Sequence, residues 1–369
     1  MNNADIAWML VSTALVLLMT PALAFFYGGL VRSKNALNTM MMSFVALGPV
    51  AVVWALLGYS LAFAPGNAVV GSLNYAGLRG VGLEAQGAIP HLLFMCFQGT
   101  FAIITPALIS GAVVERMRFN AYLAFITLWV LVVYAPVAHW VWGGGFLASM
   151  GALDFAGGAV VHVNAASAAL VAALVVGPRK DYGRHAILPH NVPFAMLGAG
   201  LLWFGWFGFN AGSALSAGTT AALAFANTLL APAAGYISPA SAIAMGAIGA
   251  FPSYFALIYR AKTKLDDSLD VVAAHGLVGG HPGQVLTQMA SVVIVLAYSG
   301  GMTFVLLKVL SLVMPLRIGD RHEGLGLDVT DHGEEAYTHG DGAILVKPKQ
   351  SAIAHAAVDV VAVQDGGQL

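Results

Sequence analysis

The chain has 369 residues, of which 59% are hydrophobic and only 9% are charged, and its formal net charge is −1. A soluble domain carries about 25% charged residues, so this composition excludes a soluble enzyme and a disordered chain. It also excludes nucleic acid as a partner, because phosphate binding requires a basic surface. The remaining class is a polytopic membrane protein embedded in the lipid bilayer.

Long apolar runs predict membrane-spanning helices, because about 20 apolar residues are needed to cross a bilayer. The runs lack the strict two-residue alternation of membrane barrels, so the expected fold class is an all-α polytopic membrane protein. The first six predicted spans are 7–31, 39–64, 90–114, 120–142, 156–177 and 193–215. Further runs follow at 219–235, 240–259, 271–280 and 284–312.

The first run has a second interpretation as a signal peptide, since Ala22-Leu23-Ala24 resembles a cleavage site. No Lys or Arg precedes the run, and its apolar stretch continues to Val31. Both features favour a membrane span over a cleaved leader.

Basic residues predict the orientation, because Lys and Arg gather on the cytoplasmic side of membrane proteins. They follow the first, third, fifth and last spans, whereas the loop 143–153 has none and Arg79 is an exception. The N-terminus is therefore expected outside and the C-terminus inside. Residues 1–316 form the predicted membrane domain, and 317–369 form a cytoplasmic tail with 13 charged residues.

Two histidines lie in apolar segments, where an ionisable group is costly and usually functional. His162 lies about eight residues into its span, roughly 12 Å deep, and His275 lies in the short run 271–280. A neutral histidine bonded to a backbone carbonyl is the alternative. Asp154 and Asp267 each precede a histidine by eight positions, which indicates an internal repeat of the kind that transporters carry in inverted orientation. An Asp at a helix start is also an ordinary N-cap.

Trp206, Phe209 and Ser213 recur at spacings of three and four, which places them on one face of a helix. Such a face suits a small cation, held by ring quadrupoles and one hydrogen bond. No acidic residue accompanies it, so a divalent metal is not expected. The single Cys96 excludes an internal disulfide and a Cys-rich metal site. No cofactor is predicted.

At these residues the chain resembles the ammonium transporter (Amt/MEP/Rh) family, in its bacterial Amt branch. The resemblance covers nearly the whole chain up to Tyr337. Its matching segments are Ala24–Asn38, Ile103–Phe119, His139–Gly145, Asp154–Asn164, Gly205–Ala214, Asp266–Gly276 and Gly326–Tyr337. The resemblance implies about 11 spans, in two inverted halves of five helices plus a C-terminal helix. It also implies a homotrimer in the cytoplasmic (inner) membrane, with one pore per subunit and a docking surface for PII-type signalling proteins.

The resemblance also implies roles for individual residues. Trp142, Phe101 and Ser213 match an outer ammonium recruitment site, and Phe101 with Phe209 match the stacked gate beneath it. The other matched residues are His162 and His275 as paired pore histidines, Asp154 as a buried support and Trp206 as a pore-lining residue. An apolar pore makes a bare cation costly, so we expect ammonium to be deprotonated. Ammonia and a proton then cross separately, with the proton relayed by the histidines.

Two stretches of the family pattern are missing, after Thr228 and after Gly280. If 219–235 crosses the membrane, the basic residues at 260–264 face outside. If it is re-entrant, these residues face inside, but 271–280 must cross with ten apolar residues, half the usual number. The sequence predicts a family member with truncated spans 7/8 and 10, and neither path satisfies both rules.

Two other functions remain open at this point. The acidic tail is compatible with an ammonium sensor that signals through a cytoplasmic partner. Two intramembrane histidines are also compatible with a haem-binding redox protein, although such sites usually pair ligands on facing helices.

Overall fold

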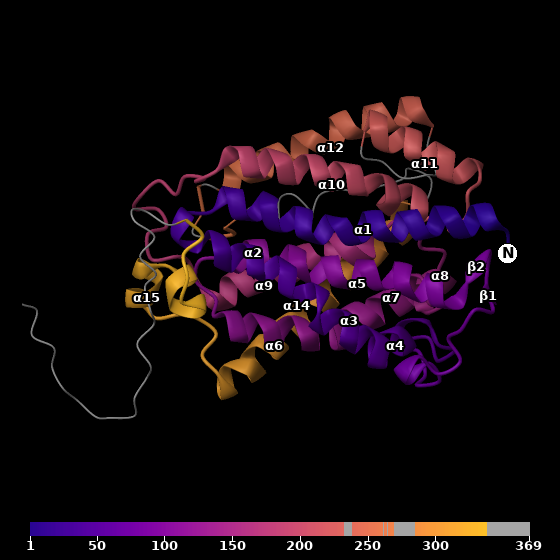
Figure 1. The fold of residues 1–369 in the computed structure, drawn as a ribbon, viewed down its shortest axis with the longest axis horizontal. Helices are drawn as coiled ribbons and strands as arrows, with labels where there is room; N and C mark the ends of the chain where they lie inside the picture. The colour runs from indigo at the N-terminus through magenta and orange to yellow at the C-terminus, as the bar shows by residue number, and fades with distance from the viewer. Residues whose placement is uncertain (232–237, 261, 264, 269–284, 338–369) are drawn as a thin grey trace, which may run out of the picture.

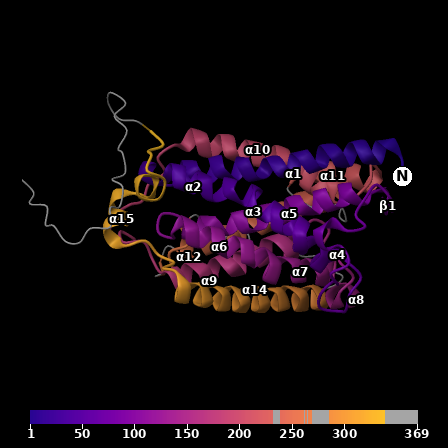
Figure 2. The same cartoon turned by 60° about the horizontal axis from the view of Figure 1, so that its bottom comes forward.

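The computed structural model describes residues 1–231, 238–260, 262–263, 265–268 and 285–337. Its long helices run side by side between two ends of an elongated bundle (Figures 1 and 2). The end that carries the N-terminus and Trp142 is here named the Trp142 end. The opposite end, which carries Arg179 and the short helix α15 (Asp320–Leu325), is named the Arg179 end.

Seven of the described helices are long and apolar enough to span a bilayer, which confirms the predicted membrane class. The first six predicted spans and the last one all coincide with them within a few residues. Some of these spans consist of several shorter helices in succession. Besides α15, the described helices are α1 (Asn3–Leu30), α2 (Ala36–Phe44), α3 (Pro49–Val53), α4 (Tyr59–Phe63), α5 (His91–Val113), α6 (Phe119–Trp129), α7 (Ala135–Val141), α8 (Phe146–Ser149), α9 (Asn164–Val176), α10 (Val192–Gly212), α11 (Thr219–Leu230), α12 (Pro239–Arg260) and α14 (Val285–Val313).

Several spans are interrupted by turns that the apolar pattern did not predict. Three segments are wide π-helical turns. Trp54–Gly58 (η3) follows α3, Val130–Tyr134 (η5) follows α6, and Gly158–Val163 (η6) precedes α9. The all-helical prediction also missed a two-residue strand pair, β1 (Ala85–Gln86) and β2 (Ile89–Pro90), which is antiparallel with Ala85 opposite Pro90. A hydropathy pattern averages over many residues and does not register changes of one or two hydrogen bonds.

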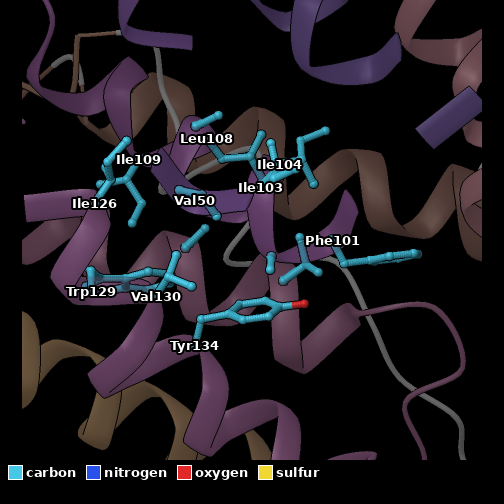
Figure 3. Packing of buried hydrophobic residues seen from close by; sticks show 14 of the residues in the cluster. Val50, Phe101, Ile103, Ile104, Leu108, Ile109, Ile126, Trp129, Val130 and Tyr134 are labelled. Carbon is cyan, nitrogen blue, oxygen red and sulfur yellow. The ribbon is translucent and has the colours of Figure 1, made fainter. Parts of the chain in front are cut away.

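The core is centred on α5, nearly all of whose residues are buried. Figure 3 shows its Ile109 beside Ile126 of α6, and its Ile103, Ile104 and Leu108 grouped on the other side of Val50. A helix that is apolar on every side is surrounded by protein. Helix α5 therefore forms a fixed axis for the elements that carry the site residues.

Helix α10 packs closely against α1 through glycines. A Cβ at Gly198 would collide with the backbone of Phe26, and one at Gly205 would collide with the side chain of Met19. Small residues let two helix backbones approach closely in a membrane, where packing drives helix association. This contact fixes α10 as one rigid wall of the bundle.

The described residues decide between the two paths left open for the second half. Near the start of α11, the Ala217 amide donates to Asp5 at the Trp142 end. Twelve residues make a helix of only about 18 Å, and its end at Ala231 lies beside Gly246, inside α12. Helix α12 ends at Arg260, and the chain just beyond it accepts hydrogen bonds from Tyr182 at the Arg179 end. The re-entrant path is therefore the observed one.

The re-entrant path leaves too few residues for the crossing before α14, as the sequence analysis predicted. Asp266 lies at the Arg179 end, paired with Arg179. Gln288, near the start of α14, exchanges two hydrogen bonds with Leu153 at the Trp142 end. The described residues therefore stop at residue 268 at one end of the bundle and resume at residue 285 at the other end. The 16 positions between them, which include His275, lie outside the described residues and are fewer than the ~20 residues of an ordinary span.

Candidate functional site

Two phenyl rings close the centre of the site. The ring centroids of Phe101 on α5 and Phe209 on α10 lie 4.5 Å apart at 43°. The two side chains are only 1% and 2% exposed. Trp142, which follows α7, places its indole 5.9 Å from Phe101 in an edge-to-face arrangement. The structure thus brings the predicted recruitment residue and the predicted gate into one continuous contact.

His162 lies on the other side of this gate. Its ring is parallel to the Trp206 indole, at 5.8 Å and 4°, and lies 5.8 Å from the Phe209 ring. A series of rings therefore leads from Trp142 through Phe101 and Phe209 to His162, and it is built by four separate elements. The four rings of this series come from distant parts of the sequence, so they meet only when the whole bundle is packed.

Ser213 caps the end of α10, one turn after Phe209. Its hydroxyl donates to the Phe209 carbonyl at 2.8 Å. Since a hydroxyl has a single proton, the Ser213 oxygen meets any other ligand as an acceptor. It can therefore accept a hydrogen bond from a ligand that carries N–H or O–H groups.

The Asp154 carboxylate supports the backbone of the site. One carboxylate oxygen accepts from the amides of Gly157 and Gly158 at 2.6 and 2.7 Å. The other accepts from Ala159 and Val160 at 2.8 and 2.9 Å. These bonds occupy the amides at the start of the His162 helix. Asp154 therefore caps this helix through its side chain, although the N-cap position itself is Gly157.

Asp154 also fixes the indole of the recruitment residue. Its backbone carbonyl accepts a hydrogen bond from Trp142 Nε1 at 2.7 Å. One residue thus positions both ends of the ring series, Trp142 through its carbonyl and His162 through its carboxylate. This double role could not be read from the eight-residue spacing.

The backbone under His162 is a π-helical turn. The amide of His162 donates to the Gly157 carbonyl at 3.0 Å, five residues earlier, and Gly157 has a φ of +106°. Such turns are often found at functional sites, because they redirect a side chain within a helix. A side chain at Gly157 would be strained in this conformation.

Phe97 is a site residue that the sequence analysis missed. Its ring lies 5.0 Å from Phe101 at 68°, one turn earlier on α5. A Cβ added to Gly212 of α10 would come within 3.0 Å of it. The available signal was the four-residue spacing of two phenylalanines, which places both on one helical face.

The two Asp–His frames begin at opposite ends of the bundle. Asp154 lies at the Trp142 end, while Asp267 follows Asp266, which is paired with Arg179. This is the arrangement expected for halves with inverted orientation. His275 itself lies outside the described residues, so its predicted pairing with His162 stays a prediction.

A buried ion network joins several elements at the Arg179 end. The Glu115 carboxylate contacts Arg179 at 2.6 Å and Arg32 at 2.9 Å, and Arg179 binds both oxygens of Asp266. Glu115 is 0% exposed and has a φ of +69°, a conformation that is rare for this residue type. Buried charges of this kind are held only when they are fully paired.

The network predicts a loss of stability in acid. Burial by itself would raise the pKa of Glu115, but the charges of Arg179 and Arg32 hold it below its ordinary value. Its contribution is therefore complete above the unfolded pKa of about 4.3 and is lost as the pH falls through the lower folded pKa. We expect the unfolding temperature in detergent micelles to fall steeply below about pH 4.

The variant Glu115→Gln tests this explanation. It should lose about 3–5 kcal/mol at neutral pH, because it breaks a buried pair, and its unfolding temperature should respond less to acid. The control is Glu84→Gln, whose side chain is 57% exposed beside His91 and should change little. An acid response equal to that of the unaltered chain would contradict the assignment to Glu115.

The segment after α14 packs on the Arg179 end. The Asp328 carboxylate accepts from the amides of Leu37 and Asn38, and the Glu323 carboxylate accepts from the Lys180 amide. Tyr337 meets the His190 ring at 3.0 Å. The first part of the predicted tail is therefore bound to the membrane bundle by its acidic side chains.

Comparison with known proteins identifies the family. The model of the Ammonium Transporter Family matches residues 7–238, 230–281 and 276–337. The chain belongs to the ammonium transporter family. An ammonium transporter of Bacillus subtilis (strain 168) is 42% identical over 403 residues, covering 91% of this chain and 99% of the relative.

Solved structures agree with this assignment. Mep2 of Saccharomyces cerevisiae superposes with a TM-score of 0.81 at 28% identity, covering 93% of this chain and 94% of that chain. A structure named Sensor Amt Protein superposes with a TM-score of 0.79 at 25% identity, covering 89% and 98%.

The family comparison also bears on the missing stretches of this ammonium transporter family member. The matched segments break at 230–238 and 276–281, next to the predicted losses after Thr228 and Gly280. The alignment with the Bacillus relative extends over 403 positions, more than this whole chain contains. The relative therefore has residues without counterparts here, as the sequence analysis expected.

Proposed function

We propose that this chain carries ammonium across the cytoplasmic membrane as ammonia and a separate proton. The Trp142 end faces outside and the Arg179 end faces the cytoplasm. Basic residues support this orientation, because they gather at the Arg179 end, where Arg32, Arg116 and Arg179 lie. The single observation that carries the proposal is the series of ring contacts from Trp142 to His162.

Recruitment takes place at Trp142, Phe101 and Ser213. Aromatic faces attract a small cation, and the Ser213 oxygen accepts one of its hydrogen bonds. Potassium resembles ammonium in charge but has no N–H group to donate. Selection therefore depends on hydrogen bonding, which suits a site whose hydroxyl proton is already committed to Phe209.

The gate then separates ammonia from its proton. The Phe101 and Phe209 rings are almost fully buried, and a bare ion would pay a large desolvation cost between them. Neutral ammonia passes more easily, and the imidazole of His162 receives the proton. In this proposal His275 continues the relay toward the cytoplasm.

Ammonium-induced current in proteoliposomes containing the full chain tests this function. We expect a saturable current with ammonium, and none above empty liposomes with an equal concentration of potassium. A folded chain that gives equal currents with both ions would overturn the selection mechanism. A folded chain that gives no current would show that the shortened second half does not support transport.

Sensing is a second candidate function, favoured by the similarity to the structure named Sensor Amt Protein and by the tail bound at the Arg179 end. In this version residues 1–316 detect ammonium and residues 317–369 signal to a cytoplasmic partner. Growth on low ammonium separates the two, since only a transporter restores growth to a strain that lacks ammonium uptake.

Assembly is part of the same proposal. We expect a homotrimer with one pore per subunit, and a PII-type signalling protein is the expected partner at the cytoplasmic face. Cross-linking in native membranes would measure the subunit number, and co-purification from nitrogen-starved cells would test the partner.

A further inference from the structure

His139 is a buried histidine that the proposed transport route does not use. It lies in the last turn of α7, three residues before Trp142, and is only 2% exposed. Its Nδ1 lies 2.9 Å from the Ala62 carbonyl oxygen, and its Nε2 lies 2.8 Å from the Asn67 carbonyl oxygen. Both partners are backbone carbonyls, which only accept hydrogen bonds.

These two contacts define the charge of the ring. A neutral imidazole carries one N–H, so its other nitrogen would turn a lone pair toward a carbonyl lone pair. Only the doubly protonated ring donates to both.

Few titratable side chains surround the His139 ring. The titratable side chains on elements that pack against α7 are Tyr59 on α4, Tyr134 on η5, His162 on η6, and Tyr298 and Lys308 on α14, with Asp154 just before η6. Asp154 is committed to four backbone amides. Among the described residues, the contacts of the His139 ring are the two carbonyls.

The loop that His139 binds is held to the same stretch of chain at two further points. Trp140 Nε1 donates to the Val69 carbonyl at 2.7 Å, and the Phe146 amide donates to the Ala68 carbonyl at 2.9 Å. Three successive carbonyls of the loop 65–72 are thus bound by the segment 139–146. The two surfaces meet so closely that a Cβ at Gly143 would collide with the Ala62 carbonyl oxygen and the His139 ring.

The backbone of His139 organises the turn after Trp142. Its carbonyl accepts from the amides of Gly143 and Gly145 at 3.0 and 2.9 Å. The same residue therefore binds the loop through its ring and the Trp142 turn through its carbonyl. A change at the ring is transmitted directly to the position of the indole.

We propose that His139 is a doubly protonated imidazolium that latches the loop 65–72 to α7 and thereby positions Trp142 for ammonium recruitment. The latch itself is independent of transport, whereas its effect on recruitment rests on the proposed function. His139 is a positioning residue, because its ring contacts the loop carbonyls and not the gate rings.

Hydrogen exchange of the loop tests the latch without requiring transport. The matched pair is His139→Gln, which removes the charged donor, and Trp140→Phe, which removes a neutral donor to the same loop. Hydrogen bonds from charged groups are roughly twice as strong as those from neutral groups. We expect amides in 65–72 to exchange at least 10-fold faster in His139→Gln, and less than 5-fold faster in Trp140→Phe. Equal effects of the two variants would overturn the charged latch.

The charge has its own spectroscopic signature. In a chain labelled with ¹⁵N-histidine, solid-state NMR at neutral pH should show one ring with both nitrogens protonated, and this signal should be absent from His139→Gln. A spectrum in which His139 is a neutral tautomer would overturn the assignment even if the loop exchanged faster.

Transport kinetics test the effect on recruitment. We expect His139→Gln to raise the KM of the ammonium current at least 5-fold while the maximal current stays within twofold, and Trp140→Phe to leave both near their original values. An unchanged KM would overturn the recruitment role. If the unaltered chain gives no current, the proposed function fails separately, and the exchange and NMR results still decide the latch.

Discussion

Replacing Asp154 by alanine is expected to destabilise the protein by about 4 kcal/mol and to abolish its ammonium current. The substitution leaves four backbone amides at the start of η6 without their acceptor. Each buried unsatisfied group costs about 1–3 kcal/mol, partly relieved by water. Because η6 carries His162, loss of the cap also displaces the histidine from the gate.

Thermal unfolding in micelles and the current in proteoliposomes measure the two effects. The control is Asp5→Ala, which removes a carboxylate at the same end of the bundle whose described bond is to one backbone amide, that of Ala217. It should cost about 1–2 kcal/mol and retain current. Asp154→Asn keeps one acceptor oxygen and should fall between the two. An Asp154→Ala protein as stable as Asp5→Ala would refute the capping role.

Replacing His162 by alanine is the second change with a large expected effect. The variant removes the group that receives the proton below the gate, so we expect less than one tenth of the original ammonium-induced current. Stability should change much less, because the backbone bonds of η6 to Asp154 do not involve the imidazole. A variant with full ammonium-dependent current would contradict the separation of ammonia from its proton.

The control for this variant is His185→Ala. His185 is an exposed histidine in the loop between α9 and α10, far from the ring series in sequence and outside the membrane spans. It should retain both stability and current. Comparing the two variants at equal protein density in the liposomes separates loss of conduction from loss of expression.

Two kinds of signal in the sequence point to the candidate site residues. His162 stands out as an ionisable group in an apolar span, and Trp206, Phe209 and Ser213 stand out by their helical spacing. The structure places these residues, with Phe101 and Trp142, in one series of contacts. Family resemblance supplied what spacing could not, namely that Phe101 on a distant helix meets Phe209.

Other features had no signal in a single sequence. The π-helical turn under His162 depends on one shifted hydrogen bond, and the partners of Glu115 come from elements more than 60 residues away in the chain. The path of α11 was predicted only as one of two alternatives, because a crossing at 219–235 placed the basic residues at 260–264 outside, while a re-entrant path left 271–280 too short to cross. In each case tertiary packing, and not local sequence, determines the outcome.

The glycine contact between α1 and α10 has a consequence for how fast the gate can act. Because the backbones touch, α10 cannot tilt or slide without losing packing along much of its length, and such collective movements take microseconds to milliseconds. Phe209 projects from this wall, and Phe101 projects from α5, nearly all of whose residues are buried. If the two rings form the proposed gate, we expect admission of each molecule to depend on brief side-chain rotations, which are much faster than helix movements, and not on an alternating-access cycle.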